Sequence, residues 1–287
     1  MNTNRRWRLL PHEVLFGLML VTEIARLAFI AGPLDGWTLF YLALLGINIA
    51  TIWLVRMADT PGVWRIGLLS YTVLMNAVYT TFKQVVPIIH PARMDVALQH
   101  IDSIFIGTNL SVRLQAFVNP ALTEFFSACY ILFFPYLVFS VITYFRSDVR
   151  IMKKFTIGLF SIYGIGFLGY SFVPGYGPFV ALAPRFTIPL TGWYITRWNS
   201  ALVTAGSNGV DIFPSLHCAV SSFFLFFDCR HKRWRFWLYL VPCVGLWCST
   251  IYLRYHYFTD VVCGFALAAL GLYLAGRYPR EEAGRGV

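Results

Sequence analysis

Eight runs of about 20 mostly apolar residues are the feature that most constrains the fold of this chain. They lie near 13–32, 37–56, 66–89, 121–145, 154–173, 213–229, 236–253 and 257–276. A helix needs about 20 such residues to cross the hydrocarbon of a bilayer. Charged residues make up 13% of the chain, about half the share usual in soluble domains. The sequence therefore predicts an all-α integral membrane protein, a bundle of about eight transmembrane helices.

The segments between these runs contain no soluble domain and no low-complexity linker, so we expect residues 1–287 to form a single membrane domain. Residues 94–117 are too polar to cross a bilayer, and their apolar residues have roughly helical spacing, which predicts an interfacial helix. Residues 174–211 are rich in glycine, proline and aromatic residues. We expect this loop to fold over the outer mouth of the bundle.

The distribution of basic residues predicts the orientation of the bundle. In a soluble protein a net charge of +10 would suggest nucleic acid as a partner. Here the basic residues lie in short loops between apolar runs, and we expect no nucleic-acid binding. One side holds sixteen of them: Arg5, Arg6, Arg8, Arg56, Arg65, Arg146, Arg150, Lys153, Lys154, Arg230, Lys232, Arg233, Arg235, Arg277, Arg280 and Arg285. The other side holds five: Arg93, Arg113, Arg185, Arg197 and Arg254. The asymmetry predicts that both termini are cytoplasmic.

With this topology, two histidines and an aspartate lie at the outer ends of predicted helices. His217 ends the segment FPSLH, and His256 and Asp260 belong to the segment RYHYFTD. Ionisable groups at membrane depth are costly, and by default they indicate a functional site. A single histidine at a membrane boundary is more often an interfacial polar residue. Two histidine motifs on different spans, both on the outer side, favour a catalytic site.

The spacing of these residues suggests how they act. His256 and Asp260 are four residues apart, so on a helix they share a face, and the carboxylate can fix the tautomer of the imidazole. Gly264 follows at a position where another helix can pack closely. Pro214 suits a first helical turn, and free N–H groups there, together with the Ser215 hydroxyl, would attract a phosphate.

The segments FPSLH and STIYLRYHYFTDVVCG resemble the second and third signature motifs of the type 2 phosphatidic acid phosphatase (PAP2) superfamily, in the form found in its inositol phosphorylceramide synthase branch. The segments KQVVPIIHP, LQHIDSIFIG and PALTEFFSACY resemble bacterial members of that branch. The resemblance covers roughly residues 70–276. It implies a PAP2-type six-helix catalytic core, which we place at residues 66–276, after accessory spans within residues 1–65.

The resemblance also implies roles for individual residues. His256 attacks phosphorus to give a phosphohistidine, Asp260 orients it, and His217 protonates the leaving oxygen. Ser215 helps to bind the phosphate. No metal or other cofactor is implied. The substrate would be a lipid phosphate or phospholipid, bound on the periplasmic side of a bacterial inner membrane.

The cation that holds the phosphate is where the chain departs from the phosphatase pattern. Ser249 and Thr250 stand where the phosphatase third motif has Ser-Arg. Arg254 lies one helical turn after Thr250 and is the first candidate to replace the missing arginine; the alternative is an interfacial anchor. Lys83, which a snorkelling role would also explain, and Arg185 in the overhanging loop are further candidates.

Three functions stay open on the sequence. A phosphotransferase would move a phosphate or phospho-head group from a lipid to the hydroxyl of an alcohol or of a second lipid. A lipid phosphate phosphatase would use water instead and release inorganic phosphate. A transporter is the distant alternative, because transporters place their polar groups near the bilayer midplane, often within repeats. The residues of the motifs, FPSLH and the Ser249-Thr250 pair, favour the transferase.

Overall fold

The computed structural model of the chain describes residues 8–278, and Arg5, Arg6, Arg280 and Arg285 of the charge pattern lie outside them. Within the described residues all regular secondary structure is helical, as predicted. Each of the eight apolar runs corresponds to one long helix or to a pair of consecutive helices. These are α2 (Pro11–Ile30), α3 (Gly36–Ala58), α4 (Pro61–Ile89), α7 (Pro120–Ile131) with α8 (Phe133–Phe145), α9 (Val149–Phe172), α12 (Leu216–His231), α13 (Arg233–Tyr252) and α14 (Phe258–Arg277).

In residues 8–278, four segments are long and apolar enough to cross a membrane. They are α3, α7 together with α8, α9 and α14. Of the other long helices, α12 has only 16 residues, and α2 contains the charged residues Glu13, Glu23 and Arg26. The fold is thus that of an all-α membrane protein, and the number of eight spans stays a prediction.

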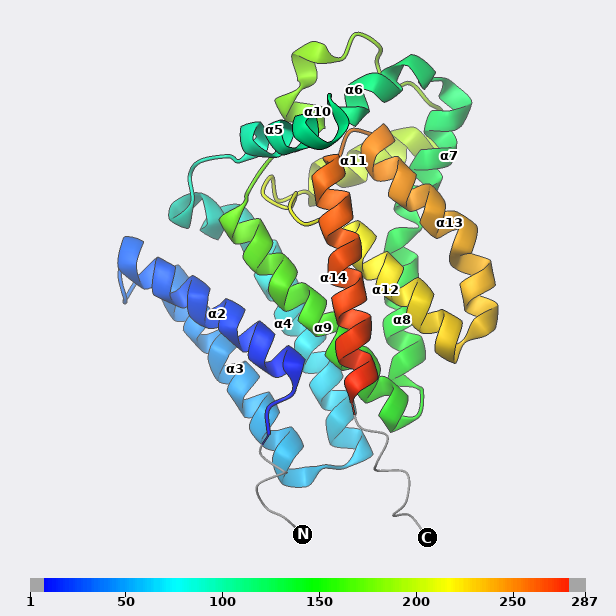
Figure 1. Cartoon of the computed structure of the whole chain (residues 1–287). Coiled ribbons are helices and arrows are strands. Elements are labelled where there is room, and N and C mark those ends of the chain that lie inside the picture. The colour runs from blue at the N-terminus through cyan, green and yellow to red at the C-terminus, as the bar shows by residue number, and fades with distance from the viewer. Residues whose placement is uncertain (1–7, 279–287) are drawn as a thin grey trace.

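The short helices gather at one end of the bundle (Figure 1). They are α5 (Asp95–Ile106), α6 (Leu110–Leu114), η1 (Gln115–Phe117), α10 (Pro178–Ala181), η2 (Ala183–Arg185) and α11 (Tyr194–Gly206). Helix α2 begins and helix α14 ends toward the opposite end of the bundle (Figure 1). Residues 94–117 are mostly helical, as predicted, but they form three helices instead of one because α5 ends at the left-handed Gly107. Residues 174–211 cover the same end of the bundle.

The centre of the bundle is α9, which packs against α2, α4, α12 and α14. It is the most buried of the four apolar segments, and Phe155, Phe160 and Phe167 contribute fully buried rings to the core. Because α2 packs along α9, the accessory helices and the predicted catalytic core share one core. The division at residue 65 stays a prediction.

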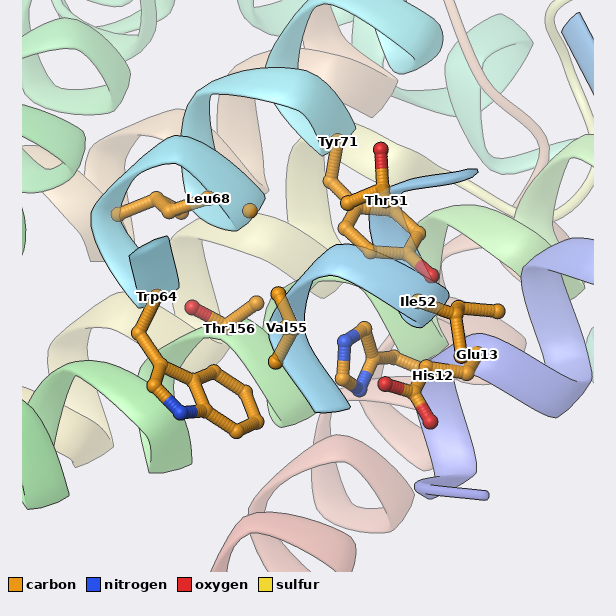
Figure 2. A pocket seen from close by; sticks show the side chains of 10 residues that line it. His12, Glu13, Thr51, Ile52, Val55, Trp64, Leu68, Tyr71 and Thr156 are labelled. Carbon is orange, nitrogen blue, oxygen red and sulfur yellow. The ribbon is translucent and has the colours of Figure 1, made fainter. Parts of the chain in front are cut away.

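Buried charges fasten the accessory helices. Near one end, Glu13 of α2 pairs with Arg56 of α3, and His12 packs edge-on against Tyr71 of α4 at 4.9 Å between ring centroids. Figure 2 shows His12, Glu13 and Tyr71 around a small cavity. Its volume of about 10 Å³ is at the lower limit for one water molecule, so it is too small for a substrate.

A second group of charges ties α2 to the ends of α4 and α9. Glu23 and Arg26 form an ion pair, with Oε2 and Nη1 3.9 Å apart. The Ser171 hydroxyl donates to Glu23 at 2.9 Å, and Arg26 donates to the carbonyl oxygens of Ile89 and Ser171. Because these carbonyls lie in the last turns of α4 and α9, where intrahelical donors are lacking, Arg26 caps both helices.

A further buried ion pair joins α12 to α13. Asp228 of α12 and Arg235 of α13 are both fully buried, with Nε 3.1 Å from Oδ2. Tyr136 and Tyr144 donate to the carboxylate, and Arg235 donates to Ser140 Oγ at 2.6 Å. The Asp228 carboxylate thus has three partners, while Arg235 Nη1 is buried without a hydrogen-bond partner among residues 8–278.

Replacing Asp228 by asparagine is expected to destabilise the protein by about 3–5 kcal/mol, because the guanidinium would stay buried without its counter-charge. Thermal unfolding in detergent measures this change. The double variant Asp228→Asn, Arg235→Met should regain part of the loss, since it removes the unpaired charge. Equal melting temperatures for the single variant and the wild type would show that the Asp228–Arg235 pair does not stabilise the fold.

Candidate active site

His256 lies in a tight turn between α13 and α14. Helix α13 ends at Tyr252, and Arg254 has a left-handed backbone with φ of +68°, which is uncommon for a residue other than glycine. The N–H groups of Tyr255 and His256 both donate to Thr250 O at 2.9 Å. The prediction that His256 and Asp260 share a helix face was wrong, because the reversal at Arg254 ends α13 and α14 starts only at Phe258.

Two oxygens surround Nδ1 of His256. The carbonyl oxygen of Ile212 is 3.1 Å away and Asp260 Oδ2 is 3.5 Å away. Asp260 Oδ2 also accepts from the Tyr257 N–H at 2.9 Å, so the carboxylate caps α14. A proton on Nδ1 satisfies Ile212 O and faces the carboxylate. This arrangement leaves Nε2 as the basic nitrogen of the ring.

His217 is the second residue of α12. Ser215 is the N-cap, with its side chain accepting from Cys218 N at 3.4 Å. Pro214 precedes the cap, so the expectation that it lies in the first helical turn was wrong. The helix start packs tightly on α14: a Cβ at Gly264 would lie 2.6 Å from Ser215 O, which confirms the predicted close approach.

Aromatic side chains hold the His217 ring. Tyr130 stacks on it at 4.8 Å and Phe133 packs at 4.6 Å. These residues flank the junction of α7 and α8 at Leu132, where Pro135 lacks the N–H that would bond Ile131 O. Tyr130 also contacts Tyr255 at 4.8 Å, so one ring bridges both histidine motifs.

The two imidazoles lie side by side, with ring centroids 5.9 Å apart and 59° between the ring planes. That separation brings their nitrogens close enough to contact a shared phosphoryl group placed between them. His256 is 2% exposed, and His217 is partly buried. The structure thus brings together His217, His256 and Asp260, the three residues that the two motifs single out.

The proposed cations lie in different surroundings. Arg254 is 5% exposed; its guanidinium lies 3.9 Å above the Phe186 ring and donates to Ile188 O at 2.5 Å. Its Nε is buried and has no hydrogen-bond partner in the part of the chain that the structure describes. Lys83 and Arg185 are exposed. The structure therefore buries one of the three candidates and leaves the other two at the surface.

The sequence did not lead us to predict a role for two carboxylates of α5, Asp95 and Asp102, beyond that of polar residues in an interfacial helix. Asp95 accepts from the N–H groups of Tyr176 and Gly177, and Asp102 accepts from those of Phe258 and Thr259. Their spacing of seven residues, two helical turns, was the available signal that they share one face.

The sequence that forms this site matches the model of a known protein family. The model of the PAP2 superfamily matches residues 96–274. The chain belongs to the PAP2 superfamily. No curated protein and no solved structure matches the chain.

The PAP2 match contains both histidine motifs, all but the first residue of α5, and most of α14. PAP2 proteins are generally phosphatases or phosphotransferases, so the paired histidines lie in a family that works on phosphate groups. Helices α2, α3 and α4 lie outside the match. The predicted core at 66–276 therefore extends about one helix beyond the matched residues.

Proposed function

We propose that the chain is an integral-membrane lipid phosphotransferase that moves a phosphate or phospho-head group from a lipid donor to a hydroxyl acceptor. The observation that carries this proposal is the pair of imidazoles 5.9 Å apart, one of which has its Nδ1 bound to Ile212 O. Transfer through a phosphohistidine needs two groups: a histidine nucleophile with a free Nε2, and a second acid–base group beside it.

The proposed reaction has two steps. In the first, Nε2 of His256 forms a bond to phosphorus while the bond from phosphorus to the donor oxygen breaks, and protonated His217 gives its proton to that oxygen. In the second, the acceptor hydroxyl attacks the phosphohistidine, and His217 takes up the hydroxyl proton. Asp260, beside Nδ1, stabilises the ring as it gains positive charge. Neither step calls for a metal ion.

The phosphate would lie at the start of α12. The N–H groups in a first helical turn lack intrahelical acceptors and attract anions. The Ser215 hydroxyl accepts from Cys218 N and keeps its own proton for a phosphate oxygen. Among the cations, burial and an unpartnered Nε favour Arg254 over Lys83 and Arg185.

Enclosure of the site favours transfer over hydrolysis. His256 is almost fully buried, and the His217 ring is packed between Tyr130 and Phe133. A phosphotransferase must keep water from the phosphohistidine until the acceptor arrives, whereas a phosphatase must admit it. The alternative is a lipid phosphate phosphatase. The distribution of basic residues supports a site on the extracytoplasmic side, which in a bacterial inner membrane would be the periplasm.

The test is to incubate the purified protein, with a chelator present, with labelled lipid phosphates and phospholipids plus candidate alcohols. The expected product, detected by mass spectrometry, carries the labelled phosphate on a new hydroxyl. Release of inorganic phosphate alone would identify a phosphatase. Turnover that is unchanged in His256→Ala would contradict both activities.

A further inference from the structure

Two buried carboxylates on α5 share one face of the helix. Asp95 and Asp102 are seven residues apart, which is about two helical turns. Both side chains point inward, while Val96, Ile104 and Phe105 on the same helix are exposed. Burial of a carboxylate is costly unless it is hydrogen-bonded. The hydrogen-bond partners of Asp95 and Asp102 therefore show which segments α5 is attached to.

Asp95 holds the loop that follows α9. Its Oδ2 accepts from Tyr176 N at 3.0 Å and its Oδ1 from Gly177 N at 2.9 Å. The backbone approaches so closely that a Cβ at Gly175 would lie 3.1 Å from the carboxylate. This loop is in turn bound to the turn before α14, because Phe179 N donates to Arg254 O at 2.7 Å.

Asp95 also reaches the residue next to the nucleophile. The Tyr257 hydroxyl donates to Asp95 Oδ1 at 2.9 Å and accepts from Gln99 of the same helix at 3.4 Å. Tyr257 is 1% exposed and directly follows His256. Its backbone N–H is bound to Asp260. The Tyr257 side chain is thus fixed by α5 and its backbone by the carboxylate that faces His256.

Asp102 holds the first turn of α14. It accepts from Phe258 N at 3.0 Å, from Thr259 N at 2.9 Å and from Thr259 Oγ1 at 2.6 Å. These N–H groups belong to a helix start, where intrahelical acceptors are lacking and a negative charge is favourable. Asp260 is the next residue along, so its position relative to His256 depends on this contact.

We infer that α5 is a clamp whose Asp95 and Asp102 are positioning residues for the nucleophile: they hold Tyr257 and the start of α14 so that His256 and Asp260 keep their geometry. The inference rests on the proposed function. Neither carboxylate is assigned a contact with substrate. Loss of the clamp therefore lowers kcat and leaves KM nearly unchanged, since displacement of a nucleophile by a fraction of an ångström slows attack on a bound substrate.

The test compares kcat and KM of variants that alter single side-chain groups of the clamp. Tyr257→Phe deletes only the hydroxyl that binds Asp95, and Thr259→Val only the one that binds Asp102. Each is expected to lower kcat about tenfold with KM within twofold, and Asp102→Asn to lower kcat about 100-fold. Tyr194→Phe is the matched control, because its side chain is 71% exposed at the same end of the bundle, and its kcat should stay within twofold.

Wild-type turnover that depends on His256, with kcat unchanged in Tyr257→Phe and Thr259→Val, would overturn the clamp and leave the proposed function standing. A raised KM at constant kcat would also overturn it, because it would indicate a role in substrate binding. If the wild type shows no turnover that depends on His256, the proposed function itself fails. Should Asp102→Asn not fold, the two hydroxyl variants decide.

Discussion

Replacing His256 by alanine is expected to lower turnover of a labelled lipid phosphate by about 10⁴-fold or more. Its Nε2 is the one nitrogen of the ring left for phosphorus once Nδ1 is bound to Ile212 O at 3.1 Å. His217 is held by Tyr130 and Phe133, and in the proposed reaction it serves the leaving oxygen, so we do not expect it to replace His256 as nucleophile. Initial rates at saturating substrate measure the loss.

The same variant should fail to form a covalent intermediate. Wild-type protein mixed with a donor labelled on phosphorus and quenched in alkali is expected to carry a phosphate that is stable in base and released in acid, as a phosphohistidine is. His100→Ala is the matched control, because this side chain is exposed on α5 at the same end of the bundle. A labelled phosphohistidine in His256→Ala would place the nucleophile elsewhere.

The helices of this fold are predictable because hydropathy and length determine them. All eight apolar runs are helical, and most observed ends lie within about five residues of the predicted ones. The interruption at Leu132 was missed, although Pro135 was a readable signal for it. The reversal after Tyr252 could not be predicted: Arg254 takes a left-handed backbone that sequence patterns associate with glycine, and tertiary contacts hold it there.

That the three candidate site residues lie together could be predicted, but the atoms that hold them in place could not. Two motifs and the count of basic residues are enough to place His217, His256 and Asp260 together. The nearest partner of His256 Nδ1, however, is the backbone carbonyl of Ile212, 44 residues earlier in the chain. Any residue type can supply a carbonyl, so composition and spacing contain no trace of this contact.

The prediction of a phosphate-binding cation was limited in a similar way, because it too depends on contacts between distant parts of the chain. Arg254 was predicted to bind the phosphate on the assumption that the helix containing Thr250 continues to Arg254. In the structure α13 ends at Tyr252, and the Arg254 guanidinium lies over Phe186 in the covering loop. Arg254 is still the buried one of the three proposed cations, and its burial depends on the loop rather than on the helix.

Replacing His217 by asparagine is expected to slow transfer from an ordinary lipid donor by about 10³-fold, the range usual for loss of a general acid. The alkoxide of a lipid alcohol is a poor leaving group, so the first step needs the proton that His217 supplies. A donor whose phosphate is esterified to an acyl-bearing phenol does not need it, because the phenol can leave as an anion. With that donor the first step should slow by less than about tenfold.

The second step still needs His217, because the ring must take up the proton of the acceptor hydroxyl. The asparagine variant given the phenol ester should therefore release one equivalent of phenol rapidly and accumulate phosphohistidine on His256. Rapid-quench measurement of phenol and of bound phosphate tests both parts. An equal loss of rate with both donors would show that His217 does not protonate the leaving group. Its place 5.9 Å from His256 would then reflect substrate binding or packing among the aromatic rings.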